Sequence, residues 1–262
     1  MTSSPTAAPT AFPPGTFAPA PQRASRLAMV KAQGLIETKL LLRHGEQQLL
    51  SVIIPIGLLI AGAVIDFLPG GQGIDLIFPM VLAVAATSAG FTGQAIAVAF
   101  DRRYGALKRT GASGVSRSTI VSGKIIAVIA LSLLQIVLLG FTAYALGFRT
   151  GITGIIVGLA VLLIGVGAFT AMGLSLGGSQ SPELVLALAN LLWFIMLGIV
   201  GWVMYSQGLG DNGLFTLIPT VAVAAGIAEA FAGVVPVYEF LVLVGWLAIA
   251  SFTAMKCFRF EG

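Results

Sequence analysis

Residues 100–124 read FDRRYGALKRTGASGVSRSTIVSGK and form the longest polar interruption between the hydrophobic runs of the chain. The segments on both sides are long and apolar, so this stretch is predicted to be a cationic loop between two membrane spans; we call it the elbow. Its single acid is Asp101, and its basic residues are Arg102, Arg103, Lys108, Arg109, Arg117 and Lys124.

The elbow carries the signals of a helix, a turn and a second helix. Residues 100–110 favour a short helix whose last turn is basic, where positive charge suits the helix dipole. Gly111 stands where a left-handed helix cap favours glycine, and Ser116 can cap the helix that follows. The pattern predicts a compact docking element at the membrane surface. The simpler alternative is a basic loop that only fixes topology.

The composition of the chain excludes a water-soluble domain. Of the 262 residues, 57% are hydrophobic and only 9% are charged, whereas a soluble domain carries about 25% charged residues. In hydrocarbon the backbone must satisfy its own hydrogen bonds within helices or closed barrels. The apolar runs are about 20 residues long and lack alternation, which favours helices. We predict an all-α polytopic membrane protein.

The positive charge of the chain does not indicate a nucleic-acid partner. The net charge of +4 is modest, and the basic residues lie beside the predicted spans, where they set membrane topology. The chain has one cysteine, Cys257, and one histidine, His44. We therefore expect no disulfide within the chain and no metal site built from these residues.

The chain divides into a tail and a membrane domain. Residues 1–25 are rich in proline, alanine and threonine, which predicts a disordered cytoplasmic tail. Residues 26–262 form the membrane domain. It begins with an amphipathic segment, residues 26–48, whose polar side carries Gln33 and Glu37. We predict an interfacial helix on the membrane surface; a plain anchor before the first span is the alternative.

Six hydrophobic segments are long enough to cross a bilayer. An even number of spans places both termini on one side, and every Lys and Arg except Arg149 then lies on that side. The positive-inside rule makes this side the cytoplasm. The predicted spans cover about residues 49–67, 77–99, 120–146, 152–176, 182–205 and 237–257.

Residues 214–233, LFTLIPTVAVAAGIAEAFAG, are long enough to form a further span. Pro219 interrupts this segment early, and Glu229 lies within it. A seventh span would also carry the C-terminus to the other side and break the charge rule. We predict a pair of short helices at the outer surface that dip into the bundle. A seventh span is the alternative.

Small and polar residues within the spans predict helix–helix contacts. Gly154 with Gly158, and Gly173 with Gly177, have the spacing that allows helices to approach closely, and packing within the chain is expected. The amides of Gln135 and Asn190 are expected to form hydrogen bonds between helices; the alternative is that they contact a substrate.

No catalytic pattern is present in the sequence. Gly123 and Lys124 lack the preceding glycine of a nucleotide-binding loop, so the chain is not predicted to be an enzyme or to bind a cofactor. Ionisable residues are scarce at mid-span, which disfavours a carrier driven by an ion gradient.

Four features together resemble the permease subunits of ATP-binding-cassette (ABC) exporters of the type-2 membrane class. Their order along residues 26–262 carries the resemblance. They are the interfacial helix with Lys39, Leu42 and Arg43 followed by Pro55, the elbow with its GALKR core and VSR exit, Asn190-Leu191-Leu192 in the fifth span, and the segment from Leu217-Ile218-Pro219 to Ala228-Glu229-Ala230 before the ending Phe258-Arg259-Phe260-Glu261.

The resemblance implies a permease in the cell membrane that pairs with a second permease copy and with cytosolic ABC ATPase subunits. ATP and Mg²⁺ would bind to those ATPases, and the substrate would be amphipathic, drug-like, lipid-linked or a polysaccharide. Pro219 and Glu229 would belong to an outer gate. The elbow residues that would couple to the ATPase are Asp101, Arg102, Arg103, Gly105, Leu107, Lys108, Arg109, Val115, Ser116 and Arg117.

The resemblance implies that the elbow transmits the movement of the ATPases, and we expect Gly105, Leu107, Lys108 and Arg109 to make that contact. Two other functions stay open from the sequence alone. One is a carrier driven by an ion gradient, which would transport without an ATPase. The other is a membrane anchor or assembly subunit that transports nothing.

Overall fold

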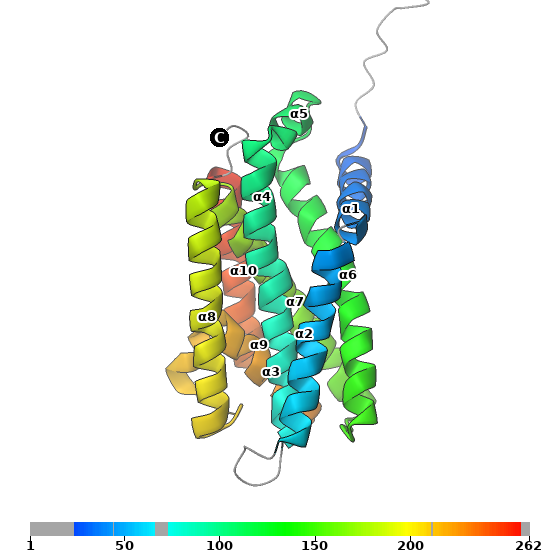
Figure 1. The fold of residues 1–262 in the computed structure, drawn as a ribbon, viewed down its shortest axis with the longest axis vertical. Coiled ribbons are helices and arrows are strands. Elements are labelled where there is room, and N and C mark those ends of the chain that lie inside the picture. The colour runs from blue at the N-terminus through cyan, green and yellow to red at the C-terminus, as the bar shows by residue number, and fades with distance from the viewer. Residues whose placement is uncertain (1–23, 44, 66–72, 211, 258–262) are drawn as a thin grey trace, which may run out of the picture.

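The computed structural model describes residues 24–43, 45–65, 73–210 and 212–257, and these residues form a bundle of helices (Figure 1). The prediction of an all-α fold is confirmed. The helices are α1 (Arg26–Arg43), α2 (Gly45–Val64), α3 (Gly73–Thr87), the π-helical turn η1 (Ser88–Thr92), α4 (Gly93–Arg103), α5 (Ala106–Ala112), α6 (Arg117–Ala145), α7 (Ile152–Gly177), α8 (Pro182–Gln207), the 3₁₀-helix η2 (Gly213–Leu217), α9 (Pro219–Phe231) and α10 (Val237–Cys257).

Some predictions fall outside the described residues. They concern nearly all of the predicted tail 1–25, His44 and the ending at residues 258–261.

Within the described residues, five helical stretches are long and apolar enough to cross a membrane. One of them joins α3, η1 and α4 into a continuous run, Gly73–Arg103; the others are α6, α7, α8 and α10. Helix α2 lies where the first span was predicted, and its apolar part, Val52–Val64, is shorter. The predicted boundaries of the later spans agree with these helices to within a few residues.

The described basic residues other than Arg149 gather at one end of the bundle, which we call the elbow end. Helices α1 and α5, the start of α6 and the last turn of α10 lie there (Figure 1). The opposite, far end holds the connection between α6 and α7, which carries Arg149, and the start of α10. The separation of charge that was predicted along the sequence is therefore also a separation in space.

Helix α9 enters the bundle from the far end and does not cross it. Just before α9, the carbonyl of Leu217 accepts a 2.9 Å hydrogen bond from Trp246 Nε1, well inside α10. After α9, the carbonyl of Phe231 accepts a 2.8 Å bond from the Thr150 hydroxyl at the far end. Helix α9 has 13 residues, or about 20 Å, against a hydrocarbon core of about 30 Å. The dipping segment is present, and a seventh span at this position is not supported.

Glycines allow α7 to pack closely against its neighbours in the same chain. A Cβ added at Gly177 would lie 2.2 Å from the carbonyl oxygen of Ala95 in α4. A Cβ at Gly154 would lie 2.7 Å from the carbonyl oxygen of Ala230 in α9. The prediction that the glycine pairs of this span pack within the chain is confirmed.

Among the described residues, the side chain of Asn190 forms no hydrogen bond to another helix, so a hydrogen bond between helices stays a prediction here. Its amide is exposed and donates a 2.8 Å hydrogen bond to the carbonyl of Leu186 in its own helix. The physical reason is that this face of α8 points away from the rest of the bundle, which leaves Leu191 and Phe194 exposed as well.

Candidate functional site

The elbow is a helix–turn–helix, as predicted, but it turns at different glycines. Helix α4 ends at Arg103, and Gly105 follows with a φ of +69°. Helix α5 then runs through Gly111, and Gly114 adopts a φ of +80°. The prediction of a cap at Gly111 is wrong, because the chain already breaks at Gly105 and restarts its helix there. Positive φ favours glycine at both turning points.

The start of α6 is fixed by a cap that the sequence identified. The hydroxyl of Ser116 accepts a 3.3 Å hydrogen bond from the backbone N–H of Thr119. This satisfies one of the free N–H groups of the first turn. Val115, just before the cap, is partly buried against the apolar cluster beneath α5. The connection from α5 to α6 is therefore fixed by the Ser116 cap and by the packing of Val115.

Leu107 anchors α5 to the bundle. Its side chain is only 4% exposed. The residues around it come from α4, α6, α7 and α10, so α5 is attached to four long helices at one point. This apolar cluster comprises Val98, Leu107, Ile120, Val121, Leu174 and Ala254.

Two arginines tie the end of α4 to the connection between α7 and α8. The buried Arg102 donates from Nη1 to the carbonyl oxygens of Gly177, at 3.1 Å, and of Gln180, at 2.9 Å. Its charge lies where the carbonyls at the end of α7 favour a cation. The exposed Arg103 forms an ion pair with Glu183 in the first turn of α8.

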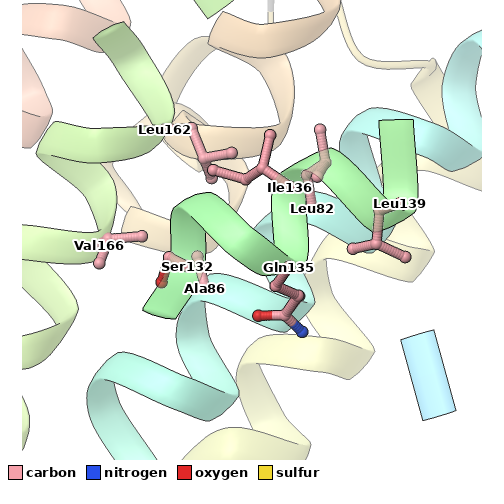
Figure 2. Close-up of a pocket in the computed structure, with 9 residues that line it drawn as sticks. Leu82, Ala86, Ser132, Gln135, Ile136, Leu139, Leu162 and Val166 are labelled. Atoms are coloured by element: carbon pink, nitrogen blue, oxygen red, sulfur yellow. The ribbon is translucent and has the colours of Figure 1, made fainter. Parts of the chain in front are cut away.

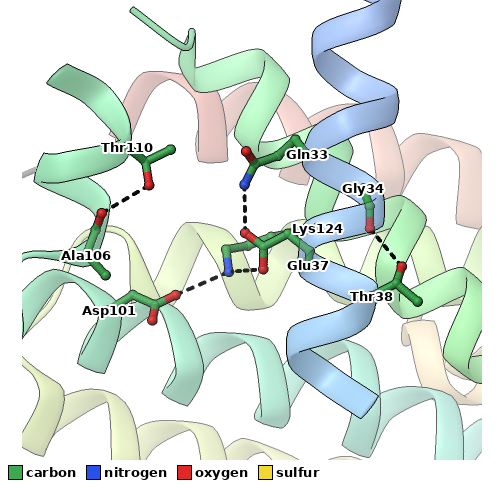
Figure 3. A network of polar contacts seen from close by, with 8 residues as sticks. All are labelled: Gln33, Gly34, Glu37, Thr38, Asp101, Ala106, Thr110 and Lys124. Atoms are coloured by element: carbon green, nitrogen blue, oxygen red, sulfur yellow. Dashed lines mark hydrogen bonds and ion pairs between the residues drawn. The ribbon is translucent and has the colours of Figure 1, made fainter. Parts of the chain in front are cut away.

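Lys124 joins three helices beneath the elbow (Figure 3). Its side chain is 4% exposed, and Nζ lies 2.9 Å from Glu37 Oε2 in α1 and 3.2 Å from Asp101 Oδ2 in α4. Gln33 donates a 2.9 Å hydrogen bond from Nε2 to the other oxygen of Glu37. We call Gln33, Glu37, Asp101 and Lys124 the Lys124 network. It holds α1 against the helices that lead into and out of the elbow.

Sequence reasoning missed the role of Glu37 and Gln33. They lie opposite the apolar stripe of α1 and were expected on its polar side, whereas the structure turns them toward α6. A Cβ added at Gly123 would lie 2.5 Å from Gln33 Cγ, so α1 packs directly on α6. The available signal was Lys124, a cation placed within a predicted span that needs a nearby acid.

The ten residues predicted for the elbow have different roles. Gly105 forms a turn, and six others hold the elbow together through the contacts described above: Asp101, Arg102, Arg103, Leu107, Val115 and Ser116. Lys108, Arg109 and Arg117 give the elbow an exposed cationic surface, to which the paired Arg103 adds. A surface of this kind suits an acidic partner. Among the described residues, no group of three or more His, Cys, Asp or Glu side chains could hold a metal ion.

Pro219 and Glu229 do not form one compact site. Pro219 is buried in the first turn of α9, and Glu229 lies near the opposite end of the same helix. Glu229 lines an open hollow at the far end of the bundle, together with Val235, Tyr238 and Glu239.

A small cavity lies in the middle of the bundle (Figure 2). Its volume is about 10 Å³, which is about the space that one water occupies. The buried hydroxyl of Ser132 has no hydrogen-bond partner among the described residues. This cavity is too small for an amphipathic substrate. The residues around it are Leu82, Ala85, Ala86, Ser132, Gln135, Ile136, Leu139, Leu162 and Val166.

The comparison with known families identifies the chain. Residues 34–210 match the family described as ABC-2 type transporter, and this range runs from the middle of α1 through the elbow to the loop after α8. The chain belongs to this family, and the resemblance drawn from the sequence is confirmed. It is a membrane-embedded permease component of a transporter. A comparison with curated protein sequences finds no match.

Proposed function

We propose that the chain is the permease subunit of an ATP-driven exporter whose separate ATPase docks on the elbow. The exported substrate is amphipathic, drug-like or lipid-linked, or it is a polysaccharide. A separate ATPase accounts for a permease whose sequence lacks a nucleotide-binding loop, because ATP and Mg²⁺ then bind to the partner.

The observation that carries this proposal is the construction of α5. Leu107 fixes the helix to the bundle from below, while Lys108 and Arg109 are exposed above it. A partner that pushes on these cations therefore moves a rigid element. Arg102 passes the displacement to α7, and Lys124 passes it to α1. Contacts of this kind, with discrete packing arrangements, are what couple distant parts of a protein.

The proposed orientation puts the elbow end and both termini in the cytoplasm of a cell-membrane protein. The elbow end holds nearly all of the basic residues, and the far end has Arg149. Basic residues are retained on the cytoplasmic side during insertion. A cytosolic ATPase can reach the elbow only in this orientation.

A second permease copy accounts for the exposed face of α8. Asn190 displays an amide on the outside of an apolar helix, beside exposed Leu191 and Phe194. This amide donates one hydrogen bond within α8, and a neighbouring helix can bind its other polar groups, which are unfavourable against lipid tails. Two copies facing each other here would enclose a substrate path that the small cavity within one chain does not provide.

The test of ATPase docking is the double charge reversal K108E/R109E. We expect the cytosolic ATPase that co-purifies with the wild-type chain to be recovered about tenfold less, which corresponds to roughly 1.4 kcal/mol of binding. Membrane insertion and the elution profile of the permease should not change. ATP-driven transport into inverted vesicles should fall in parallel.

The matched control is K31E/K39E, which reverses two exposed cations on α1 at the same end of the bundle. This variant should keep the ATPase. Equal loss in both variants would indicate a nonspecific effect of charge, and unchanged transport in K108E/R109E would refute docking through the elbow. Transport without any ATPase would instead indicate a carrier driven by an ion gradient.

A further inference from the structure

We propose that the hollow at the far end, lined by Glu229 and Glu239, binds the cationic group of an amphipathic substrate. The hollow lies between the end of α9 and the start of α10, and its volume is about 370 Å³. This falls within the range of about 300–1,000 Å³ that small-molecule sites occupy. Its identity as a substrate site, rather than a site for any organic cation, rests on the proposed export function.

Glu239 is the main evidence that this hollow binds a ligand. Its side chain is 4% exposed and lines the hollow. Neither a hydrogen bond nor an ion pair reaches its carboxylate from the residues that the structure describes. A nearly buried charge without a partner is unfavourable. A cation that enters the hollow would supply the missing partner.

The two acids are brought to one face of α9. A Cβ added at Gly226 would lie 3.0 Å from Glu239 Cβ and 3.4 Å from its Cγ, so the stem of Glu239 packs on α9 at Gly226. Glu229 follows Gly226 by three residues and therefore lies on the same helical face. Gly226 thus makes room for Glu239 beside the helix that carries Glu229.

The position of Glu239 in the first turn of α10 does not explain its burial. An acid there favours the helix dipole, yet an exposed side chain would serve that purpose at lower desolvation cost. Asp75 illustrates this, because it is exposed in the first turn of α3 at the same end of the bundle.

The basic residue of the far end is engaged elsewhere. Arg149 donates from Nη1 to the carbonyl oxygens of Tyr144, at 2.6 Å, and of Phe148, at 2.7 Å. Its guanidinium also lies 3.9 Å from the centre of the Tyr144 ring. The charge of Glu239 is therefore left for an external cation.

The lining favours an organic cation over a metal ion. Two carboxylates fall short of the six to eight oxygen ligands that Ca²⁺ takes. Val235, Val237 and Tyr238 supply apolar surface and an aromatic ring, and Tyr238 is 49% exposed. An alkylammonium group can pair its charge with the carboxylates, pack its hydrocarbon against the valines and place its cation over the Tyr238 ring.

The test measures binding to the full chain in nanodiscs of zwitterionic lipid without any ATPase. The probe is a fluorescent alkyl-trimethylammonium followed by anisotropy, with its uncharged alcohol analogue as reference. We expect E239Q to raise the Kd of the cation about tenfold, E229Q to raise it less, and neither to affect the alcohol. E239D keeps the charge and should bind nearly as the wild type does.

The matched control is D75N, which removes an exposed acid at the far end outside the hollow and should change the Kd less than twofold. A Kd in E239Q equal to that of the wild type would overturn the proposal, as would tight Ca²⁺ binding that displaces the probe. If E239Q elutes as an aggregate, the comparison of E229Q with D75N decides instead, and equal affinities would refute the site. Failure here leaves the ATPase-docking experiment unaffected.

Discussion

Lys124 shows how one residue can fix the position of a surface helix. Its ammonium group is buried beneath the elbow and is neutralised by acids from α1 and α4. A buried charge is favourable only while its partners are in place, so removing one member costs more than removing the whole group. The packing of α1 on the bundle therefore depends on Asp101 of α4, because both helices share the charge of Lys124.

The first prediction tests this dependence with K124M. The variant keeps the volume and removes the charge, which leaves Glu37 and Asp101 close together without a cation. We expect the free energy of unfolding in mixed micelles to fall by about 3 kcal/mol. Limited proteolysis should also cut near α1 sooner, because its strongest polar attachment is lost.

The control is the triple variant K124M/E37Q/D101N, in which no charge is left unpaired. It should recover much of the stability lost in K124M. If K124M unfolds as the wild type does, the Lys124 network is not what holds α1.

At the scale of elements, the contact between α7 and the run from α3 to α4 depends on small residues. Gly177 and Gly173 of α7 approach the backbone of α4 and η1, where a Cβ would lie 2.2 Å and 2.5 Å from carbonyl oxygens. The π-helical turn η1 lies in the same contact and carries Gly90, which faces Phe169. Close approach at these glycines places the end of α7 within reach of Arg102.

The second prediction concerns G177A. The added methyl cannot fit against the carbonyl of Ala95, so α7 and α4 must separate. Overpacking of this kind costs about 1–3 kcal/mol. Separation should also break the hydrogen bond from Arg102 to the carbonyl of residue 177. We expect a lower thermal midpoint in detergent and less ATPase bound at the elbow.

G140A is the matched control, because a Cβ at Gly140 in α6 meets no atom within 4 Å and lies outside the proposed contact with a second copy. The same substitution there should be neutral, or stabilising by up to about 1 kcal/mol through helix propensity. Equal stability of the two variants would show that the close contact of α7 with α4 is absent.

On the scale of the whole molecule, the two ends of the bundle differ in charge and in chemistry. The elbow end presents cations to a partner, whereas the far end holds an acidic hollow. In the proposed orientation, the first faces the cytosol and the second faces the exterior. Energy input and substrate contact would then occur at opposite ends, joined by α7 and α10.

The third prediction fixes this orientation by labelling single cysteines in a C257S background. Ser113 lies at the exposed tip of the elbow, and Gln207 is the exposed last residue of α8 at the far end. In intact cells, an impermeant maleimide should label Q207C and leave S113C unlabelled. S113C should react once the cells are opened, and the reverse pattern in intact cells would contradict the proposed orientation.

Much of the architecture could be predicted from the sequence. The spans at residues 152–176 and 237–257 agree closely with α7 and α10, and the Ser116 cap is where the sequence placed it. These features depend on local properties, namely the length of an apolar run and the chemistry of a helix start. The prediction of a cap at Gly111 is wrong because the elbow has glycines at positions 105, 111 and 114 and turns at Gly105 and Gly114, and local propensity does not choose among them.

The sequence by itself determined that this chain is a helical membrane protein with one cationic end. Hydrophobic length and charge position along the chain suffice for that conclusion. Only the tertiary structure decided that Lys124 meets Glu37, 87 residues away, that Leu107 is buried while Lys108 is exposed, and that Glu239 lies beside Gly226. These contacts depend on which faces of distant helices meet, and that is set by packing of the whole bundle rather than by any local pattern.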